Sequence, residues 1–157
     1  MNRKILLVII ALFLLAYPAY GGMDGFGIGV IAGEPTGLSI KKWIDDKSAI
    51  DGSLAWSFID DTAFQIHSDY LRHKIVFTEE FKSRLPFYYG VGARIKFKDK
   101  DKEDDDVRVG IRIPVGLTYL FKEEPVDLFI EIVPILDLAP ETDIKLNAAV
   151  GIRFYLK

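Results

Sequence analysis

The sequence contains no cysteine, which excludes a disulfide framework, a cysteine-ligated zinc site and a lipid-modified cysteine anchor. Its formal net charge of −3 at pH 7 provides no overall attraction to nucleic acid. After the first residues, no stretch carries the apolar period of an amphipathic helix. The 157 residues are therefore expected to form one domain built from strands.

The acidic segment 99–106 has the composition of a calcium-binding loop but not its spacing. An EF-hand loop requires glycine at its sixth position and glutamate at its twelfth. Counted from Asp99, these positions hold Asp104 and Gly110. We interpret the segment as a solvated loop, with weak divalent-ion contact near a lipid surface as the alternative. The sequence predicts no metal site and no cofactor.

Residues 1–21 have the composition of a secretory signal peptide. Arg3 and Lys4 precede an apolar run, and small residues, Ala19 and Gly21, stand before a cleavage point after Gly21. A single membrane-anchoring helix is the alternative, but such a helix needs about 20 apolar residues and this run is shorter. We expect the signal to be cleaved, which leaves residues 22–157 as the mature domain.

The segment Val107–Phe121 shows the clearest strand pattern of the chain. Successive side chains of a strand point to opposite faces of the sheet. Every second residue from Val107 is apolar, and the last two of this set are aromatic. The alternate residues are small, polar or charged, apart from Pro114 and Leu120. At about 3.3 Å per residue, this strand is long enough to cross a bilayer when tilted.

Seven other stretches alternate in the same manner, some less regularly. Consecutive strands joined by short turns form an antiparallel meander. Longer connections are expected at residues 78–85 and 98–106. The eight predicted strands are residues 26–33, 38–44, 49–58, 63–77, 87–97, 107–121, 126–138 and 144–156.

Alternation alone does not say which face points outward. A soluble lipocalin-like barrel places apolar residues inside, whereas a membrane barrel places them outside. The signal peptide favours the membrane arrangement, as does a second face rich in small residues with a few large charges, which suits a narrow interior. Aromatic residues near the strand ends are typical of interfacial girdles, and these are Phe26, Phe58, Phe64, Phe87, Tyr89, Phe97, Tyr119, Phe121 and Phe154.

Because lipid offers no water to an open sheet edge, a sheet with an outward apolar face must close. The sequence therefore predicts the all-β class and an eight-stranded antiparallel up-and-down transmembrane β-barrel. Pro114 and Pro134 oppose a regular ladder, because proline donates no backbone hydrogen bond. Counting back from the turn at 122–125 places the two prolines nearly opposite each other, where one bulge between strands six and seven would accommodate both.

The pattern resembles the small eight-stranded outer-membrane β-barrels of the OmpA and OmpX kind. The resemblance covers Gly25 to Leu156 and rests on the strand number, the alternation, the opening hairpin GEPTGLSIKKW and the aromatic-rich last strand AAVGIRFYLK. It implies an outer-membrane location, contact with membrane lipid and lipopolysaccharide, insertion by the outer-membrane assembly machinery, a monomer and no nucleic-acid partner. The chain departs from such barrels by ending in Lys157 rather than an aromatic residue, and by its short outer loops.

Polar residues on the non-apolar face are the candidate functional set. Register counts place Asp69 about opposite Arg94, with Arg112 diagonal to Arg94. They also place His67 near Lys96 and Glu131 close to Arg153. A charge inside a narrow barrel requires a partner, because its desolvation is costly. We expect a salt-bridge plug, with a gated conduit as the alternative, built from His67, Asp69, Arg94, Arg112, Glu131 and Arg153.

The pair His67–Ser68 raises the possibility of a lipid-modifying hydrolase. Adjacent strand residues point to opposite faces, which prevents a nucleophile–base contact between them. The nucleophile-elbow motif G-x-S-x-G is also missing. We therefore predict a non-enzymatic outer-membrane barrel with a structural or surface-interaction role. The alternatives are an outer-membrane lipid-modifying enzyme and a soluble lipocalin-like carrier of an apolar ligand.

Overall fold

The computed structural model describes residues 25–58, 63–76, 85–98, 106–121 and 123–156. The predicted signal peptide, the core of the acidic loop and nearly all of the predicted connection at 78–85 lie outside these residues. Among the described residues, no helix is long and apolar enough to cross a membrane.

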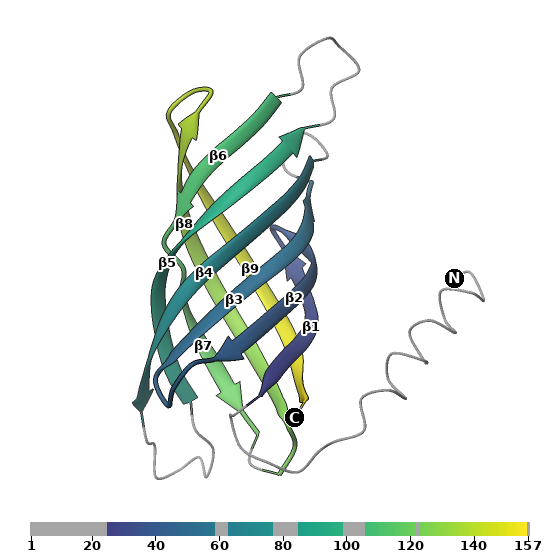
Figure 1. Ribbon diagram of the computed structural model, residues 1–157, viewed down its shortest axis with the longest axis vertical. Helices are drawn as coiled ribbons and strands as arrows, with labels where there is room; N and C mark the ends of the chain where they lie inside the picture. Colours follow the sequence, from purple (N-terminus) through teal and green to yellow (C-terminus); the bar gives the residue numbers. More distant parts are fainter. Residues whose placement is uncertain (1–24, 59–62, 77–84, 99–105, 122, 157) are drawn as a thin grey trace, which may run out of the picture.

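The described chain forms one antiparallel sheet that closes on itself (Figure 1). Strands that follow one another in sequence pair with each other, except β6 and β7, and β1 also pairs with β9, where Phe26 lies opposite Leu156. The strands are β1 (Phe26–Gly33), β2 (Thr36–Trp43), β3 (Ser48–Ser57), β4 (Ala63–Val76), β5 (Leu85–Lys98), β6 (Asp106–Arg112), β7 (Val115–Leu120), β8 (Val126–Ala139) and β9 (Asp143–Leu156).

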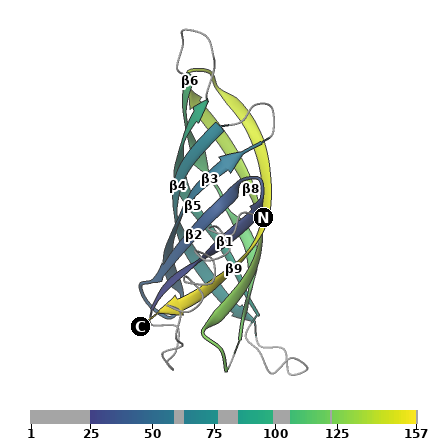
Figure 2. The ribbon, with the colours of Figure 1, turned by 90° about the vertical axis from the view of Figure 1, so that its right-hand side faces the viewer.

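The nine strands form an eight-stranded barrel, because β6 and β7 are two halves of the predicted strand 107–121. Both halves pair with β5 on one side and with β8 on the other. The eight predicted strands are confirmed, with ends displaced by at most two residues. Figure 2 shows an elongated cylinder in which β1 begins and β9 ends at the same end.

The strand breaks at Ile113 and Pro114, opposite Pro134 and Val133 of β8. The predicted bulge at the two prolines is wrong, because Arg112 pairs with Ile135 and Val115 with Ile132 in unchanged register. Backbone bonds still cross the break: Ile113 N donates to Pro134 O (3.0 Å) and Gly90 N donates to Pro114 O (2.9 Å). The register shift lies instead between Val109 and Gly110.

Apolar side chains cover the outside of the barrel, as the alternation predicts for a membrane barrel. The lipocalin-like arrangement, in which the same side chains line the interior, is wrong. On β6, β7 and their flanks, Arg112 and Thr118 point inward and are fully buried. The outward set is 37% to 51% exposed and consists of Val107, Val109, Ile111, Ile113, Val115, Leu117 and Phe121.

The interior holds two small apolar clusters between its polar residues. One lies near the termini and contains Trp43, Ala49, Leu120 and Tyr155. The other contains Ile31, Leu71, Tyr88, Phe129 and Ala149. An eight-stranded barrel has an interior just wide enough for side chains to fill, so the fold places its polar residues in close contact with one another.

Candidate functional site

The polar interior of the barrel is the candidate site. All six residues that the sequence singles out lie there, with exposures between 0% and 5%. They come from five strands around the ring: β4 carries His67 and Asp69, and β5, β6, β8 and β9 carry one each. Several of their contacts share one geometry, in which a side chain reaches over an inward-facing glycine to a partner two strands away.

The Asp69–Arg112 pair shows this geometry clearly. Gly92 of β5 lies opposite Asp69 of β4 on one side and opposite Arg112 of β6 on the other. Arg112 Nε donates to both carboxylate oxygens of Asp69, at 3.0 and 3.1 Å. A methyl group at position 92 would overlap Asp69 Oδ1. The glycine therefore provides the space through which β4 and β6 are joined.

Two further pairs repeat the arrangement between β5 and β8. Gly110 lies opposite both Arg94 and Asp137, and Arg94 Nη2 donates to both carboxylate oxygens of Asp137 at 2.8 Å. Gly116 lies opposite both Tyr88 and Glu131.

The Tyr88 hydroxyl donates to Glu131 Oε2 at 2.9 Å. A methyl group at position 116 would lie 2.5 Å from that hydroxyl. Arg112 Nη2 lies 3.7 Å from Glu131 Oε1, which links this pair to the Asp69–Arg112 pair.

Arg153 of β9 joins the two sides of the ring closure. Its Nε donates to Ser39 Oγ of β2 at 3.1 Å, again across a glycine, because Gly29 lies opposite both residues. Its guanidinium nitrogens lie 3.7 Å from Asp127 and 3.8 Å from Asp51. The guanidinium carbon is 3.8 Å from the centre of the Phe129 ring, a cation–π contact.

A buried cation lies near the termini. Lys41 Nζ donates to His73 Nε2 at 2.9 Å, so His73 carries its ring proton on Nδ1, which faces Lys47 O at 3.3 Å. Lys41 Nζ is also 4.5 Å from the centre of a Trp43 ring. The arrangement satisfies a buried lysine with a neutral histidine and an aromatic face.

Several predicted contacts are wrong, because the predicted registers between adjacent strands are displaced by two residues for β4–β5 and by four for β8–β9. Asp69 lies opposite Gly92, and His67 rather than Asp69 lies opposite Arg94. Glu131 lies opposite Ala149, and Arg153 opposite Asp127. The diagonal placement of Arg112 and Arg94 is confirmed. Asp69–Arg112 and Arg94–Asp137 instead pair over a glycine between strands that are not adjacent, which a register count between neighbouring strands does not reveal.

The interior also contains polar residues beyond the six predicted from the sequence. Each shares the inward parity of its strand, so the alternation itself places them inside. A second signal is an inward glycine that lies between two polar residues of the flanking strands. Among these additional buried residues are Lys41, Asp51, His73, Tyr88, Asp127 and Asp137.

The described residues offer little for hydrolytic or metal chemistry. His67 is buried inside, whereas Ser68 faces outward and its hydroxyl donates to Asp51 O at 3.0 Å. No group of three or more His, Asp or Glu residues in the described part of the chain is arranged to hold a metal ion. The arrangement favours electrostatic cross-linking of the barrel wall.

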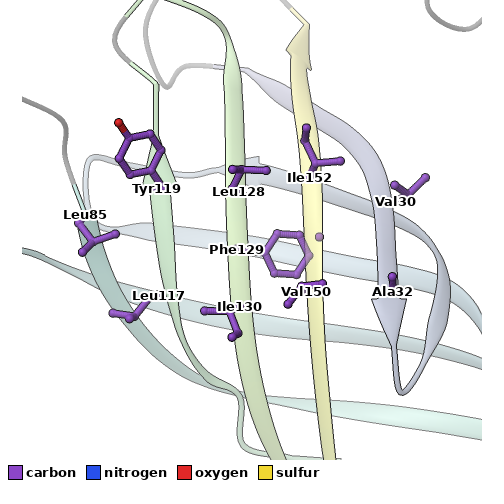
Figure 3. Close-up of a pocket in the computed structure, with 11 residues that line it drawn as sticks. Val30, Ala32, Leu85, Leu117, Tyr119, Leu128, Phe129, Ile130, Val150 and Ile152 are labelled. Atoms are coloured by element: carbon purple, nitrogen blue, oxygen red, sulfur yellow. The ribbon is translucent and has the colours of Figure 1, made fainter.

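The outer wall carries a shallow apolar hollow across β7, β8, β9 and β1 (Figure 3). Outward side chains such as Val30, Ile130 and Val150 surround it. The Phe129 ring fills the space beneath Gly151, where an added methyl group would overlap the ring. The hollow continues the apolar outer surface.

Comparisons with other proteins agree with this architecture. The N-terminal β-barrel domain of Pseudomonas aeruginosa OprF, known from a crystal structure, superposes with a TM-score of 0.64 at 16% sequence identity. The match covers 87% of this chain and 100% of that domain, which establishes a shared fold. None of the curated proteins matches the sequence. The family described as "Protein of unknown function (DUF3996)" matches residues 21–156, and the chain belongs to that family.

Proposed function

We propose that this protein is a monomeric, non-enzymatic barrel of a bacterial outer membrane whose interior is plugged by its own side chains. Its role in this proposal is structural or one of surface interaction, with membrane lipid and lipopolysaccharide as neighbours. A signal peptide at residues 1–21 and the outer-membrane assembly machinery would deliver it there. The observation that carries the proposal is an apolar outer wall around a charged, cross-linked interior.

The outer surface supports insertion in lipid. Soluble monomers rarely expose apolar patches larger than a few hundred Å², yet large apolar side chains of this barrel are exposed on all nine strands. In the closed sheet, each described strand is hydrogen-bonded to a neighbour on both sides. A membrane protein built from strands requires this pairing. The fold shared with the OprF barrel domain is consistent with this location.

The height of the apolar band also supports it. On β5, the outward aromatic residues Phe87 and Phe97 stand ten positions apart, or about 33 Å along the strand at about 3.3 Å per residue. A strand tilt of about 40° reduces this to about 25 Å, the height of the apolar band in outer-membrane barrels. Trp56, Phe64 and Phe97 form a row on three neighbouring strands, with ring centroids 5.5 and 6.3 Å apart.

The interior supports a plug rather than a pore. Asp69, Arg112, Glu131 and Tyr88 form one connected group that spans the strands from β4 to β8. Opening a conduit would require breaking these contacts. A buried ion that loses its partner costs about 3–5 kcal/mol, so the closed arrangement is strongly favoured.

Membrane fractionation of the expressed protein tests the location. We expect the protein in the outer-membrane fraction, with an unheated form that migrates anomalously on a gel because a closed barrel resists detergent. Recovery of a soluble protein from the periplasm would overturn the proposal.

Conductance in planar bilayers tests the plug. We expect the wild-type barrel to be silent and the double variant Tyr88→Ala/Arg112→Ala, which removes the tyrosine and the guanidinium from the centre, to pass ions. Lys74→Ala, on the exposed face of β4, is the matched control and should stay silent. Heat-modifiable mobility establishes that each variant is folded. Steady conductance by the wild-type barrel would favour the gated conduit.

A further inference from the structure

The outer wall of the barrel carries charge at only one place in the described strands. The outward-facing side chains of these strands are uncharged except for Lys42 of β2 and Arg72 and Lys74 of β4. All three are exposed, and β3 lies between the two strands that carry them. We call these three residues the cationic patch. Cations that served only to mark the membrane interface would be spread around the ring, as the outward aromatic residues are.

The cationic patch lies at the end of the barrel where β1 begins and β9 ends (Figure 1). Lys42 is the last residue but one of β2. On β4, Arg72 and Lys74 lie opposite Tyr89 and Phe87 of β5, two outward aromatic residues at the edge of the apolar band. Lipid head groups meet their chains at the level of such aromatic residues. The patch therefore stands at head-group height.

The charges of the patch are not paired within the described part of the chain. The side chains of Lys42 and Lys74 form no ion pair or hydrogen bond with its residues. The Nη1 of Arg72 donates to Ser48 Oγ at 3.1 Å, which orients the guanidinium through a neutral group. A guanidinium has five N–H donors, so Arg72 keeps both its charge and most of its donors for another partner.

Acidic residues near the patch do not cancel its charge. The β2–β3 turn adds Asp45, Asp46 and Lys47, which leaves four cations against two carboxylates. Asp45 Oδ1 is already engaged, because it accepts from two backbone N–H groups of the turn at 2.8 and 2.7 Å. The connection 77–84, outside the described residues, has two acidic and two basic residues and adds no net charge. The acidic residues 123–124 lie on the far side of the ring, between β7 and β8.

The complementary group at this height is the phosphate of a lipid. Charges on a lipid-facing wall are costly at the bilayer midplane but not near its interface, where long cationic side chains extend toward the head groups. A phosphate accepts hydrogen bonds in the fork geometry of arginine. A zwitterionic head group brings its own ammonium beside the phosphate. An anionic head group keeps the net negative charge that complements the patch.

The wall next to the patch offers an apolar surface for the lipid chains. Ile50 of β3 lies opposite both Lys42 and Tyr70, and Tyr70 stands two residues from Arg72, toward the other end of the barrel. Ile50 and Tyr70 face outward and are 47% and 45% exposed. The strands β2 to β4 therefore present cations at the edge of the band and apolar side chains beside them.

We propose that the cationic patch binds the phosphate of an anionic phospholipid in the leaflet at the end of the barrel where the termini lie. Arg72 and Lys74, neighbours on one face of β4, contact the phosphate, and Lys42 attracts it from the other side of β3. The chains of the lipid lie against Ile50 and Tyr70. This inference rests on the proposed insertion in lipid and adds to it a lipid class and a position on the wall.

Native mass spectrometry of the folded protein, released from dodecyl maltoside micelles, tests the lipid class. The probes are phosphatidylglycerol and phosphatidylethanolamine with the same chains, each titrated separately. Phosphatidylglycerol should bind to saturation. Phosphatidylethanolamine should bind at least about fivefold more weakly, because its ammonium removes the net charge that each cation would attract. Equal affinity for the two lipids, or no retained lipid, would overturn the proposal.

Two double variants test the position. Arg72→Gln/Lys74→Gln should weaken phosphatidylglycerol binding about twentyfold, since each cation beside an anionic lipid contributes about fivefold. Lys100→Gln/Lys102→Gln removes the same charge from the acidic segment 99–106 and should bind like wild type. Equal weakening by both variants would show nonspecific attraction and overturn the site.

Heat-modifiable mobility establishes that each variant is folded, and membrane fractionation separates the two proposals. A barrel that inserts in the outer membrane but does not distinguish the two lipids overturns this inference alone. A soluble protein overturns the proposed function, and the lipid site with it.

Discussion

Gly110→Ala probes the glycine-bridged pairs with the smallest possible change. A methyl group at position 110 would lie 2.5 Å from Asp137 Oδ1 but 3.1 Å from the nearest backbone atom, Leu136 O. The substitution therefore acts mainly on the carboxylate. To reach ordinary van der Waals separation, Oδ1 must move by about 1 Å. That movement ends the two-point contact with Arg94.

The expected loss follows from the contacts of the pair. Asp137 accepts three hydrogen bonds from Arg94, at 2.8, 2.8 and 3.2 Å, and each bond to a charged group contributes about 1.5–3 kcal/mol. Losing one of them lowers the free energy of unfolding by about 2 kcal/mol. Gly52→Ala is the matched control. Its methyl group would meet its nearest atom at 3.2 Å, and we expect a change within about 0.5 kcal/mol.

Denaturant unfolding in micelles, followed by the fluorescence of the two tryptophans, measures both variants. The decisive comparison repeats Gly110→Ala in an Arg94→Met/Asp137→Ala background, where the oxygen that the methyl group displaces is missing. The cost of the methyl group should fall to within about 0.5 kcal/mol there. An unchanged cost would mean that backbone crowding, not the ion pair, requires glycine at position 110.

Three further outcomes are expected. Arg153→Lys keeps the charge but loses the planar fork that contacts Ser39 and Phe129, so denaturant unfolding should show a loss of about 1–3 kcal/mol. Gly116→Ala places a methyl group 2.5 Å from both the Tyr88 hydroxyl and Ile130 O and should lower the unfolding midpoint, an effect that a Tyr88→Ala background should reduce but not remove, because the backbone oxygen remains. In the β2–β3 turn, the backbone N–H groups of Lys47 and Ser48 hold the pKa of Asp45 below its usual 3.8. The ionised Asp45 therefore stabilises the protein above its usual pKa, and this stabilisation is lost as pH falls through the lowered pKa of the folded state. In Asp45→Asn, the unfolding midpoint should depend less on pH below about pH 4.

The alternation in the sequence was sufficient for the fold, because a strand has only two faces and the apolar set of this chain is the outward one. Val107–Phe121 illustrates this: its outward and inward sets are those of the structure. The break at Ile113–Pro114 was harder to predict from the sequence. A proline disrupts a ladder, but whether the sheet responds with a bulge or a gap depends on the opposite strand, and here the register continues unchanged.

The members of the interior set were predictable by parity, but their partners were not. Asp69 has no counter-charge directly opposite, since Gly92 stands there. Its partner Arg112 is one strand further on, and only a long side chain above a glycine reaches that far.

Arg153 has a consequence for how the barrel forms. Its partner Ser39 is 114 residues away in sequence, and the two meet only when β1 has joined β9. Hairpins such as β8–β9 bring Arg153 to Asp127 early, whereas the contacts with Ser39 and Asp51 wait for the ring to close. Because long-range contacts of this kind form after the loop entropy has been lost, Arg153 stabilises the completed ring more than any open sheet that precedes it. Arg153 therefore makes the last step of folding, the closure of the ring by β1 and β9, cooperative.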